Sequence, residues 1–298
     1  MPAHADPPTP APRTLHRRAA GYPRAPRVGR VLRAGARHAV LLAVAGAMLF
    51  PVLWALITSF KPANDIYGTD PVPWPASLEH YRSALDDFPI VRLLVNTFVM
   101  AAGVTLAQLT VGVLAGYALV RFHVPLRGWM MGALAVALVV PTQSLIVPHF
   151  LMLAELGWRD SYPGLVLPQL SGCALAVLLL HEHVKAIPAG LLGAAALEGA
   201  TPWETLRFVV LPLLRPALGA VAVLVFISTW NEYLWPLLAA PSREHTTIQV
   251  GLQLFQNQEG PNPGPLLAAA MLATLPVVAV YLFASRRVAD AFLHSGLR

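Results

Sequence analysis

Residues 184–216 read VKAIPAGLLGAAALEGATPWETLRFVVLPLLRP and lie between two long apolar runs. The stretch carries five charged residues, which are Lys185, Glu198, Glu204, Arg207 and Arg215. Because one charge at a bilayer centre costs about 2.5–3.5 kcal/mol on insertion scales, five charges would oppose burial by roughly 15 kcal/mol. The sequence therefore places this stretch outside the lipid.

The local pattern of the same stretch predicts two short helices separated by a glycine. Pro188 fits the first turn of a helix that continues through the Ala-rich residues 189–197, and Gly199 suits the left-handed position after its end. Thr201-Pro202-Trp203-Glu204 is typical of a capping box, with Thr201 as the N-cap and Glu204 at the third helical position. Since the second helix leads into the next apolar run, the pattern indicates a docking element on a membrane protein.

These residues resemble the cytoplasmic "EAA" loop of permease subunits of ABC importers. The family pattern is Glu-Ala-Ala, then Asp-Gly-Ala, then Leu-Pro, and this chain has Gly193 in place of the first Glu and Glu198 in place of the Asp. The resemblance implies that residues 184–216 form a coupling loop that docks in a groove on a separate ATPase subunit. The residues implied for this coupling are Gly193, Ala194, Ala195, Glu198, Gly199, Ala200, Thr201, Leu211 and Pro212. The alternative is an Ala-rich interfacial helix with no partner.

Composition indicates an integral membrane protein. The chain is 56% hydrophobic and 12% charged, whereas soluble proteins average about 45–50% apolar and about 25% charged residues. The single cysteine, Cys173, lies inside an apolar run, so the chain can form neither an intramolecular disulfide nor a cysteine metal site. The formal charge of +6 has its excess among the arginines before the first apolar run, which on a membrane protein marks the cytoplasmic end rather than a nucleic-acid site.

We expect two regions along the chain. Residues 1–38 are rich in Pro, Ala and Arg and predict a disordered basic cytoplasmic tail. A cleaved signal peptide is not expected, because the next apolar run is about 20 residues long and signal cores have about 7–15. Residues 39–298 predict a six-helix transmembrane domain, since about 20 residues are needed to span a bilayer. The spans are expected near residues 39–58, 93–119, 129–153, 163–182, 217–240 and 265–284.

The third span is interrupted by Pro141 and Pro148, and broken helices are tolerated where they face protein or a water-filled path. The distribution of basic residues predicts that both termini and residues 184–216 are cytoplasmic, and that residues 59–90 and 241–263 are external. In this arrangement the outward segments hold only Lys61, Arg82, Arg92, Arg159 and Arg243.

Further motifs resemble the maltose-type carbohydrate importers, and the likeness covers residues from about 39 to 298. They are Lys61-Pro62, Trp74-Pro75, His80-Tyr81, Glu155-Leu156-Gly157-Trp158, Pro163-Gly164-Leu165, Trp230-Asn231-Glu232-Tyr233-Leu234-Trp235-Pro236 and Gly296-Leu297. The chain looks most like the smaller, six-span permease of that family, although His80 stands where Asn is more usual. The resemblance implies an all-α, type I ABC importer permease fold with a cytoplasmic helix-Gly-helix coupling loop.

The same resemblance implies a plasma-membrane subunit that carries sugars or oligosaccharides. Its partners would be two ABC ATPase subunits, a second permease subunit in a heterodimer, an extracytoplasmic solute-binding protein and membrane lipid. It would have no catalytic residue, cofactor or metal of its own. The sequence contains no Gly-x-x-x-x-Gly-Lys-Ser/Thr motif, so the energy must come from another chain or from an ion gradient.

Five polar residues in the apolar runs are candidates for lining a translocation path. Sugar hydroxyl groups need paired donors and acceptors once they lose water, and an ionisable residue in a span is a functional candidate by default. The candidates are Asn96, Gln108, Gln143, Asn231 and Glu232. The amide side chains could instead hydrogen-bond neighbouring helices, which is the favoured interpretation. Glu232 could be a carboxylate at the outer membrane boundary, flanked by the aromatic residues that gather there. His181-Glu182-His183 resembles a metal motif, but residues two apart on a helix diverge, so we expect a solvated interfacial cluster.

Three alternatives remain. The first is the same kind of importer for another solute, such as a polyamine or a phosphonate. The second is an ion-coupled secondary transporter, which predicts inverted repeats and several buried carboxylates, whereas Glu232 is nearly the only candidate. The third is a membrane scaffold, which the capped double helix with its family spacing disfavours.

Overall fold

The computed structural model describes residues 27–68, 70, 72–259 and 263–295, and it describes side chains for 35–68, 70, 72–256 and 263–283. All regular structure in these residues is helical. The chain divides into two compact units, Met1–Val52 and Leu53–Arg298. Each unit is described by itself below.

Helix α1 (Arg27–Ser59) forms the described part of the first unit and ends in the second. The segment Gly35–Ser59 is long and apolar enough to cross a membrane, which agrees with the first expected span. Residues 27–38 were expected to belong to a disordered tail, but the structure has them as helix. The reason is that Arg, Ala, Leu and Val favour helix and that no proline occurs between Pro26 and Pro51. The rest of the expected tail, residues 1–26, lies outside the described residues.

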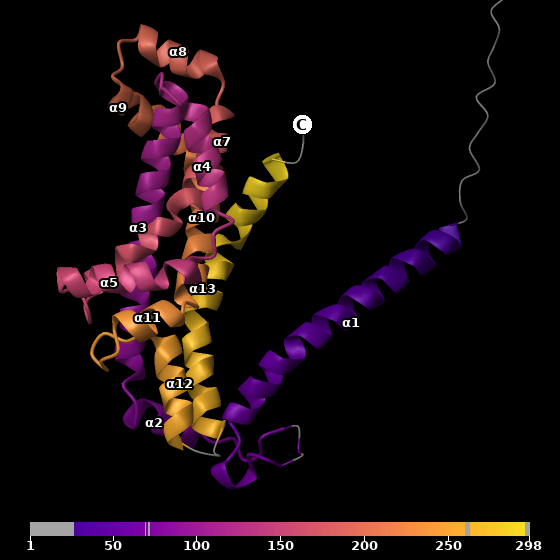
Figure 1. Cartoon of the computed structure of the whole chain (residues 1–298). Helices are drawn as coiled ribbons and strands as arrows, with labels where there is room; N and C mark the ends of the chain where they lie inside the picture. Colours follow the sequence, from indigo (N-terminus) through magenta and orange to yellow (C-terminus); the bar gives the residue numbers. More distant parts are fainter. Residues whose placement is uncertain (1–26, 69, 71, 260–262, 296–298) are drawn as a thin grey trace, which may run out of the picture. The chain divides into compact units, whose positions relative to one another are not determined.

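The second unit is a bundle of helices joined by short 3₁₀ and π segments (Figure 1). Its α-helices are α2 (Glu79–Asp86), α3 (Ile90–Arg121), α4 (Arg127–Ala137), α5 (Ile146–Leu156), α6 (Tyr162–Val166), α7 (Ala174–Lys185), α8 (Ala189–Leu197), α9 (Pro202–Glu204), α10 (Leu211–Trp230), α11 (Leu234–Ala239), α12 (Ile248–Glu259) and α13 (Pro263–Ser295). The 3₁₀ segments are η1 (Ala63–Asp65), η2 (Thr142–Leu145) and η3 (Pro168–Cys173), and the π segment is η4 (Thr205–Val210).

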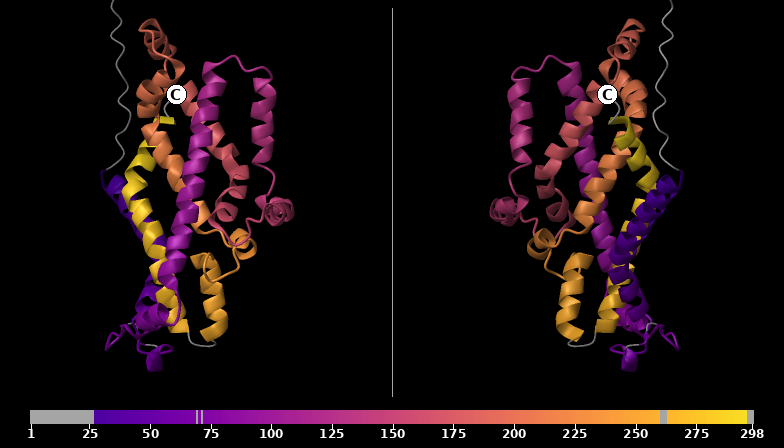
Figure 2. Two further views of the ribbon diagram at one scale, coloured as in Figure 1. Left: turned by 90° about the vertical axis from the view of Figure 1, so that its left-hand side faces the viewer. Right: turned by 90° about the vertical axis from the view of Figure 1, so that its right-hand side faces the viewer.

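The expected all-α, six-span architecture is confirmed in outline. Four further segments of the described chain are long and apolar enough to cross a membrane: Ile90–Arg121, Tyr162–Lys185, Pro202–Trp230 and Pro263–Phe283. The count reaches six if the helix pair Arg127–Ala137 and Thr142–Leu156, which is bent by 97° at its junction, is one broken span. Figure 2 shows α5 nearly end-on where α4 runs lengthwise.

The break in this bent pair has one proline as its cause. Pro141 adopts an extended backbone with ψ of 129°, and proline also disfavours helix in the residue before it. Pro148, which was expected to contribute, lies in the first turn of α5. A proline there costs the helix nothing, because the first amides have no intrahelical acceptor.

The fifth span begins and ends earlier than expected. It was expected to run to residue 240, but α10 ends at Trp230 and α11 is a separate short helix. The Asn231 side-chain Nδ2 donates to the carbonyl oxygen of Ile227 at 2.8 Å, and the Asn231 amide also donates to that carbonyl, at 3.2 Å. This local bonding by an Asn side chain competes with continuation of the helix.

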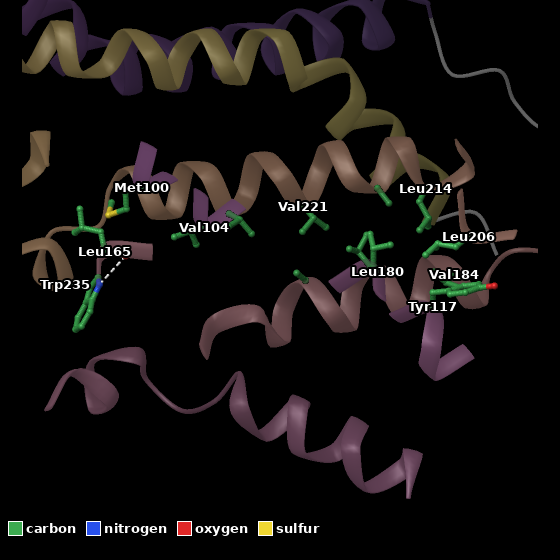
Figure 3. Packing of buried hydrophobic residues seen from close by; sticks show 14 of the residues in the cluster. Met100, Val104, Tyr117, Leu165, Leu180, Val184, Leu206, Leu214, Val221 and Trp235 are labelled. Carbon is green, nitrogen blue, oxygen red and sulfur yellow. Dashed lines mark hydrogen bonds between the residues drawn. The ribbon is translucent and has the colours of Figure 1, made fainter. Parts of the chain in front are cut away.

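Helices α3, α7 and α10 pack around the main apolar core. Figure 3 shows its side chains meeting in a row from Met100 and Leu165 at one end to Leu206 and Tyr117 at the other. At the first end the indole Nε1 of Trp235 donates to the carbonyl oxygen of Leu165 at 3.3 Å. A second cluster joins the start of α3 to α10, α12 and α13, with Trp230 and Phe255 at its centre.

The Asp160 carboxylate holds the segment between α11 and α12 in place through contacts with Ser242 and His245. Asp160 accepts hydrogen bonds on Oδ1 from the Ser242 hydroxyl at 2.7 Å and from the Ser242 amide at 3.3 Å, and its Oδ2 lies 3.6 Å from Nδ1 of His245. Burial acts to raise the pKa of Asp160, but the two hydrogen bonds and the nearby imidazole outweigh it and hold the pKa below its usual value.

Two glycines allow α3 and α7 to approach closely. A Cβ atom on Gly112 would lie 3.1 Å from the Ala176 Cβ, and one on Gly116 would lie 3.0 Å from the backbone nitrogen of His181. The glycines are four residues apart, so they lie on one face of α3, as in the small-residue interfaces of membrane helices.

We therefore expect Gly116→Val to destabilise the bundle by about 1–3 kcal/mol, because the new methyl groups meet backbone that cannot move aside. The measurement is thermal unfolding of the purified chain in detergent. Gly132→Val on α4 is the matched control, since a Cβ there meets nothing within 4 Å. Equal unfolding temperatures for both variants would contradict close packing at Gly116.

Candidate functional site

Helix α8 lies at one end of the second unit, beyond the ends of α3 and α7, and α9 lies beside the end of α3 (Figure 1). The helix predicted at 189–197 is confirmed with those bounds. Pro188, expected in the first turn, is instead the residue before it, with an extended backbone (φ −56°, ψ 128°).

The glycine break is confirmed and ends α8. Gly199 has φ of +82°, its amide donates to the carbonyl oxygen of Ala196 at 3.1 Å, and the Ala200 amide donates to that of Ala195 at 3.0 Å. This pair of bonds is the Schellman motif, which satisfies the last carbonyl groups of a helix. The break is thus a fixed turn with its backbone groups paired.

The capping box is also confirmed. The Glu204 amide donates to the Thr201 hydroxyl oxygen at 3.3 Å, and the Thr201 amide donates to Oε2 of Glu204 at 2.8 Å. The hydroxyl of Tyr117 on α3 donates to the carbonyl oxygen of Pro202 at 2.9 Å. Helix α9 is therefore bonded both to its own cap and to α3.

Beyond the cap the chain forms the π segment η4 and enters α10. Thr205, Leu206 and Val210 are buried, and the latter two belong to the main core. Pro212 has no N–H to donate to the Phe208 carbonyl, and its ring crowds that group. The wider π turn lies directly before this proline.

Helix α8, in contrast, buries none of its residues. The Leu197 side chain of α8 is 91% exposed, and the Trp203 side chain of α9 is 61% exposed. These side chains lie in the stretch whose charges exclude it from lipid, and exposed apolar patches of this kind mark interaction surfaces. The helix pair therefore combines an exposed face with a base that is anchored in the bundle.

A pocket of about 240 Å³ lies deeper in the second unit, among the helix interruptions at η2, η3 and Asn231. Its polar lining residues are Gln108, Thr142, Gln143, His149, Gln169, Ser171, Ser228, Thr229 and Glu232, and Trp235 contributes an aromatic wall. Irregular backbone at membrane depth is tolerated where it lines such a cavity or is buried in protein.

Three of the five predicted path residues line this pocket together: Gln108, Gln143 and Glu232. The other two lie elsewhere. Asn96 accepts a bond from the Tyr162 hydroxyl at 2.7 Å and donates to the carbonyl oxygens of Glu244 and Thr246, both at 2.9 Å, so it has a packing role. Asn231 is exposed and terminates α10.

The sequence interpretation missed His149, Gln169, Ser171 and Ser228 as pocket residues. The signal for His149 was that it is a polar residue within the broken span, six residues after Gln143. No local signal marked Gln169, Ser171 or Ser228, because each lies beside the pocket only through the packing of η3 and α10.

The His181-Glu182-His183 cluster does not converge on one point. Nε2 of His181 lies 2.9 Å from the Arg127 guanidinium, whereas Nδ1 of His183 lies 2.8 Å from the carbonyl oxygen of Leu179. His181 is buried, which differs from the expected solvated cluster, because it packs against Gly116 under α4.

Comparisons with known proteins agree with this architecture. A family model described as "Binding-protein-dependent transport system inner membrane component" matches residues 108–292. The chain is 31% identical over 262 residues to the trehalose transport system permease protein SugB of Mycobacterium tuberculosis, which covers 85% of this chain and 96% of that protein. It is 33% identical over 254 residues to the sn-glycerol-3-phosphate transport system permease protein UgpE of Escherichia coli, which covers 82% and 90%.

Solved structures share the fold. A chain of a bacterial ABC transporter involved in the import of the acidic polysaccharide alginate superposes with a TM-score of 0.77 at 23% identity, over 89% of this chain and 99% of that one. A chain of the alginate transporter in complex with a pentasaccharide-bound periplasmic protein gives a TM-score of 0.65 at 14% identity, over 86% and 94%.

The turn at Gly199 can be tested apart from packing. A Cβ at Gly199 meets nothing within 4 Å, so Gly199→Val introduces backbone strain alone. We expect about 1–2 kcal/mol of local destabilisation, because left-handed backbone is unfavourable for a β-branched residue. Amides of residues 195–204 should then exchange with deuterium about 5–30 times faster. The control is Gly193→Val, which also meets no neighbour within 4 Å but lies inside α8. Equal exchange rates in both variants would show that the left-handed backbone at residue 199 does not require glycine.

Proposed function

The chain belongs to the family of binding-protein-dependent transport system inner membrane components, and from that premise we propose that it is a permease subunit of an ATP-driven importer for sugars or oligosaccharides. The observation that carries the proposal is the match to this family together with the permease relatives, which align over more than four-fifths of the chain. It is a multi-pass membrane protein of the plasma membrane. The subunit transmits motion and forms part of a path, and it catalyses no reaction itself.

The solute class rests on the relatives. Trehalose is a disaccharide and glycerol 3-phosphate is a polyol ester, so the two named solutes share a polyhydroxylated character. A polyamine or phosphonate importer has no such support. An ion-coupled transporter is disfavoured as well, because Glu232 is the only carboxylate among the residues that line the pocket.

The proposed assembly has four other chains. Two ATPase subunits supply the energy, since this chain has no nucleotide-binding motif. A second permease subunit forms the other half of the path in a heterodimer. An extracytoplasmic solute-binding protein delivers the solute.

The helix pair α8–α9 is proposed to couple these ATPases to the bundle. The small residues Gly193, Ala194 and Ala195 let the backbone of α8 approach a partner closely, and Leu197 offers an exposed apolar contact. Motion of α8 passes through the Schellman turn to α9, and from there through Tyr117 to α3 and through η4 to α10. Closure of the ATPase pair thereby moves the helices that surround the pocket.

Docking predicts that Ala195→Trp abolishes transport. The indole would hold the two backbones apart, so we expect solute uptake and ATPase co-purification to fall at least about tenfold, as in a lost interface anchor. The variant should still insert in the membrane, because Ala195 packs on nothing in the core. Ala186→Trp, exposed at the end of α7, is the control for bulk alone. Retained uptake and co-purification in Ala195→Trp would refute the docking assignment.

The orientation predicts a labelling pattern in intact cells. In a Cys173→Ala background, single cysteines replacing Asn64 and Arg243 should react with an impermeant thiol reagent, because both positions are exposed and external. A cysteine replacing Leu197 should react only after the cells are opened. Labelling of the Leu197 position in sealed cells would invert the arrangement.

A further inference from the structure

The pocket among the broken helices has a chemistry that the transport assignment alone does not specify. We propose that it is a solute-contacting subsite contributed by this subunit, that it takes uncharged polyhydroxylated solutes, and that Glu232 makes it reject anions. The inference rests on the proposed function, because a solute reaches this pocket only if the chain is a permease.

The first argument is unused hydrogen-bonding capacity. The hydroxyl groups of Ser171 and Ser228 and the ring nitrogens of His149 make no hydrogen bond to the residues that the structure describes, although all three line the pocket. The side-chain Nε2 of Gln108 donates to the carbonyl oxygen of Gln169 at 2.8 Å. Its Oε1 makes no hydrogen bond to the described residues. Donors and acceptors left free around a cavity match the alternating hydroxyl groups of a sugar.

The second argument is the aromatic wall. Trp235 lines the pocket and packs edge-to-face on His149, with ring centroids 5.7 Å apart. Its indole nitrogen is already bonded to the Leu165 carbonyl, which fixes the ring. A fixed aromatic surface beside a few polar groups is the usual make-up of a small-molecule site.

The third argument is charge. Glu232 is the only carboxylate among the lining residues, and none of them is Lys or Arg. Its Oε1 accepts from the Trp235 amide at 3.3 Å, so the carboxylate is held at the start of α11, and its Oε2 makes no hydrogen bond to the described residues. A phosphate or carboxylate solute would meet this negative group with no cation to offset it.

The test measures occupancy of the pocket directly, so that the selectivity of the solute-binding protein does not enter. Ser228→Cys in a Cys173→Ala background is assembled with its partner permease and ATPases in vesicles, and its reaction with a small permeant thiol reagent is timed. The uncharged probes are trehalose, maltose and cellobiose, and the anionic probes are sn-glycerol 3-phosphate and galacturonate. Thr274→Cys, exposed on α13 outside the pocket, is the control position.

At least one uncharged probe should slow labelling of Ser228→Cys about threefold or more once its concentration exceeds about twice its dissociation constant. Anions should need at least about tenfold higher concentration, and Glu232→Gln should remove that difference, because the amide keeps the acceptor for Trp235 but not the charge. Glu155→Gln, exposed on α5, makes the same charge change outside the pocket and should leave the difference in place.

Labelling that no uncharged probe slows would overturn the subsite, and protection by anions equal to that by sugars would overturn the role of Glu232. Binding-protein-stimulated ATP hydrolysis by the Thr274→Cys complex is read in parallel. If that activity is present while protection is absent, the subsite is wrong and the permease function stands. If that activity is absent, the proposed function itself fails.

Discussion

The structure depends on one constraint, which is that peptide groups in an apolar medium must pair within the chain. Helices meet it along most of the bundle, and each interruption has its own solution. At Asn231 the solution is a bond from the side-chain amide to the Ile227 carbonyl. At η2, η3 and the end of α10 the interruptions surround a polar pocket. The interruptions of regular helix within the bundle thus coincide with the candidate pocket.

The sequence predicted the features that depend on near neighbours. The helix at 189–197, the left-handed glycine and the Thr201–Glu204 box all follow from residues within one or two turns of each other, and all are present. The bounds of the long spans were predicted to within a few residues where no proline or asparagine intervened. Local rules were sufficient there because the hydrogen bonds themselves are local.

The features that depend on packing were predicted only in part. An apolar run does not reveal that the chain bends by 97° after Pro141 whereas Pro148 leaves its helix intact. The effect of each proline depends on where α5 begins. Nor does an apolar run reveal that Asn96 is fully bonded to residues 148 and 150 positions away, whereas Gln108 faces a cavity. The two amides look alike in sequence, and only the neighbouring helices distinguish a packing residue from a candidate for solute contact.

The π segment η4 has a consequence for how this loop can vary in length. A π turn holds one more residue than an α turn, and each residue of an α-helix advances the side chains by about 100° around the axis. Loss of one residue between Thr205 and Val210 would restore α-helical winding with little harm to α10. Because the tighter α winding and the lost residue nearly cancel in rotation, α9 would keep roughly the same orientation about the helix axis. The face that α8 presents is therefore tolerant of a one-residue deletion within η4, whereas the same deletion in the regular helix of α10 would turn that face by about 100°.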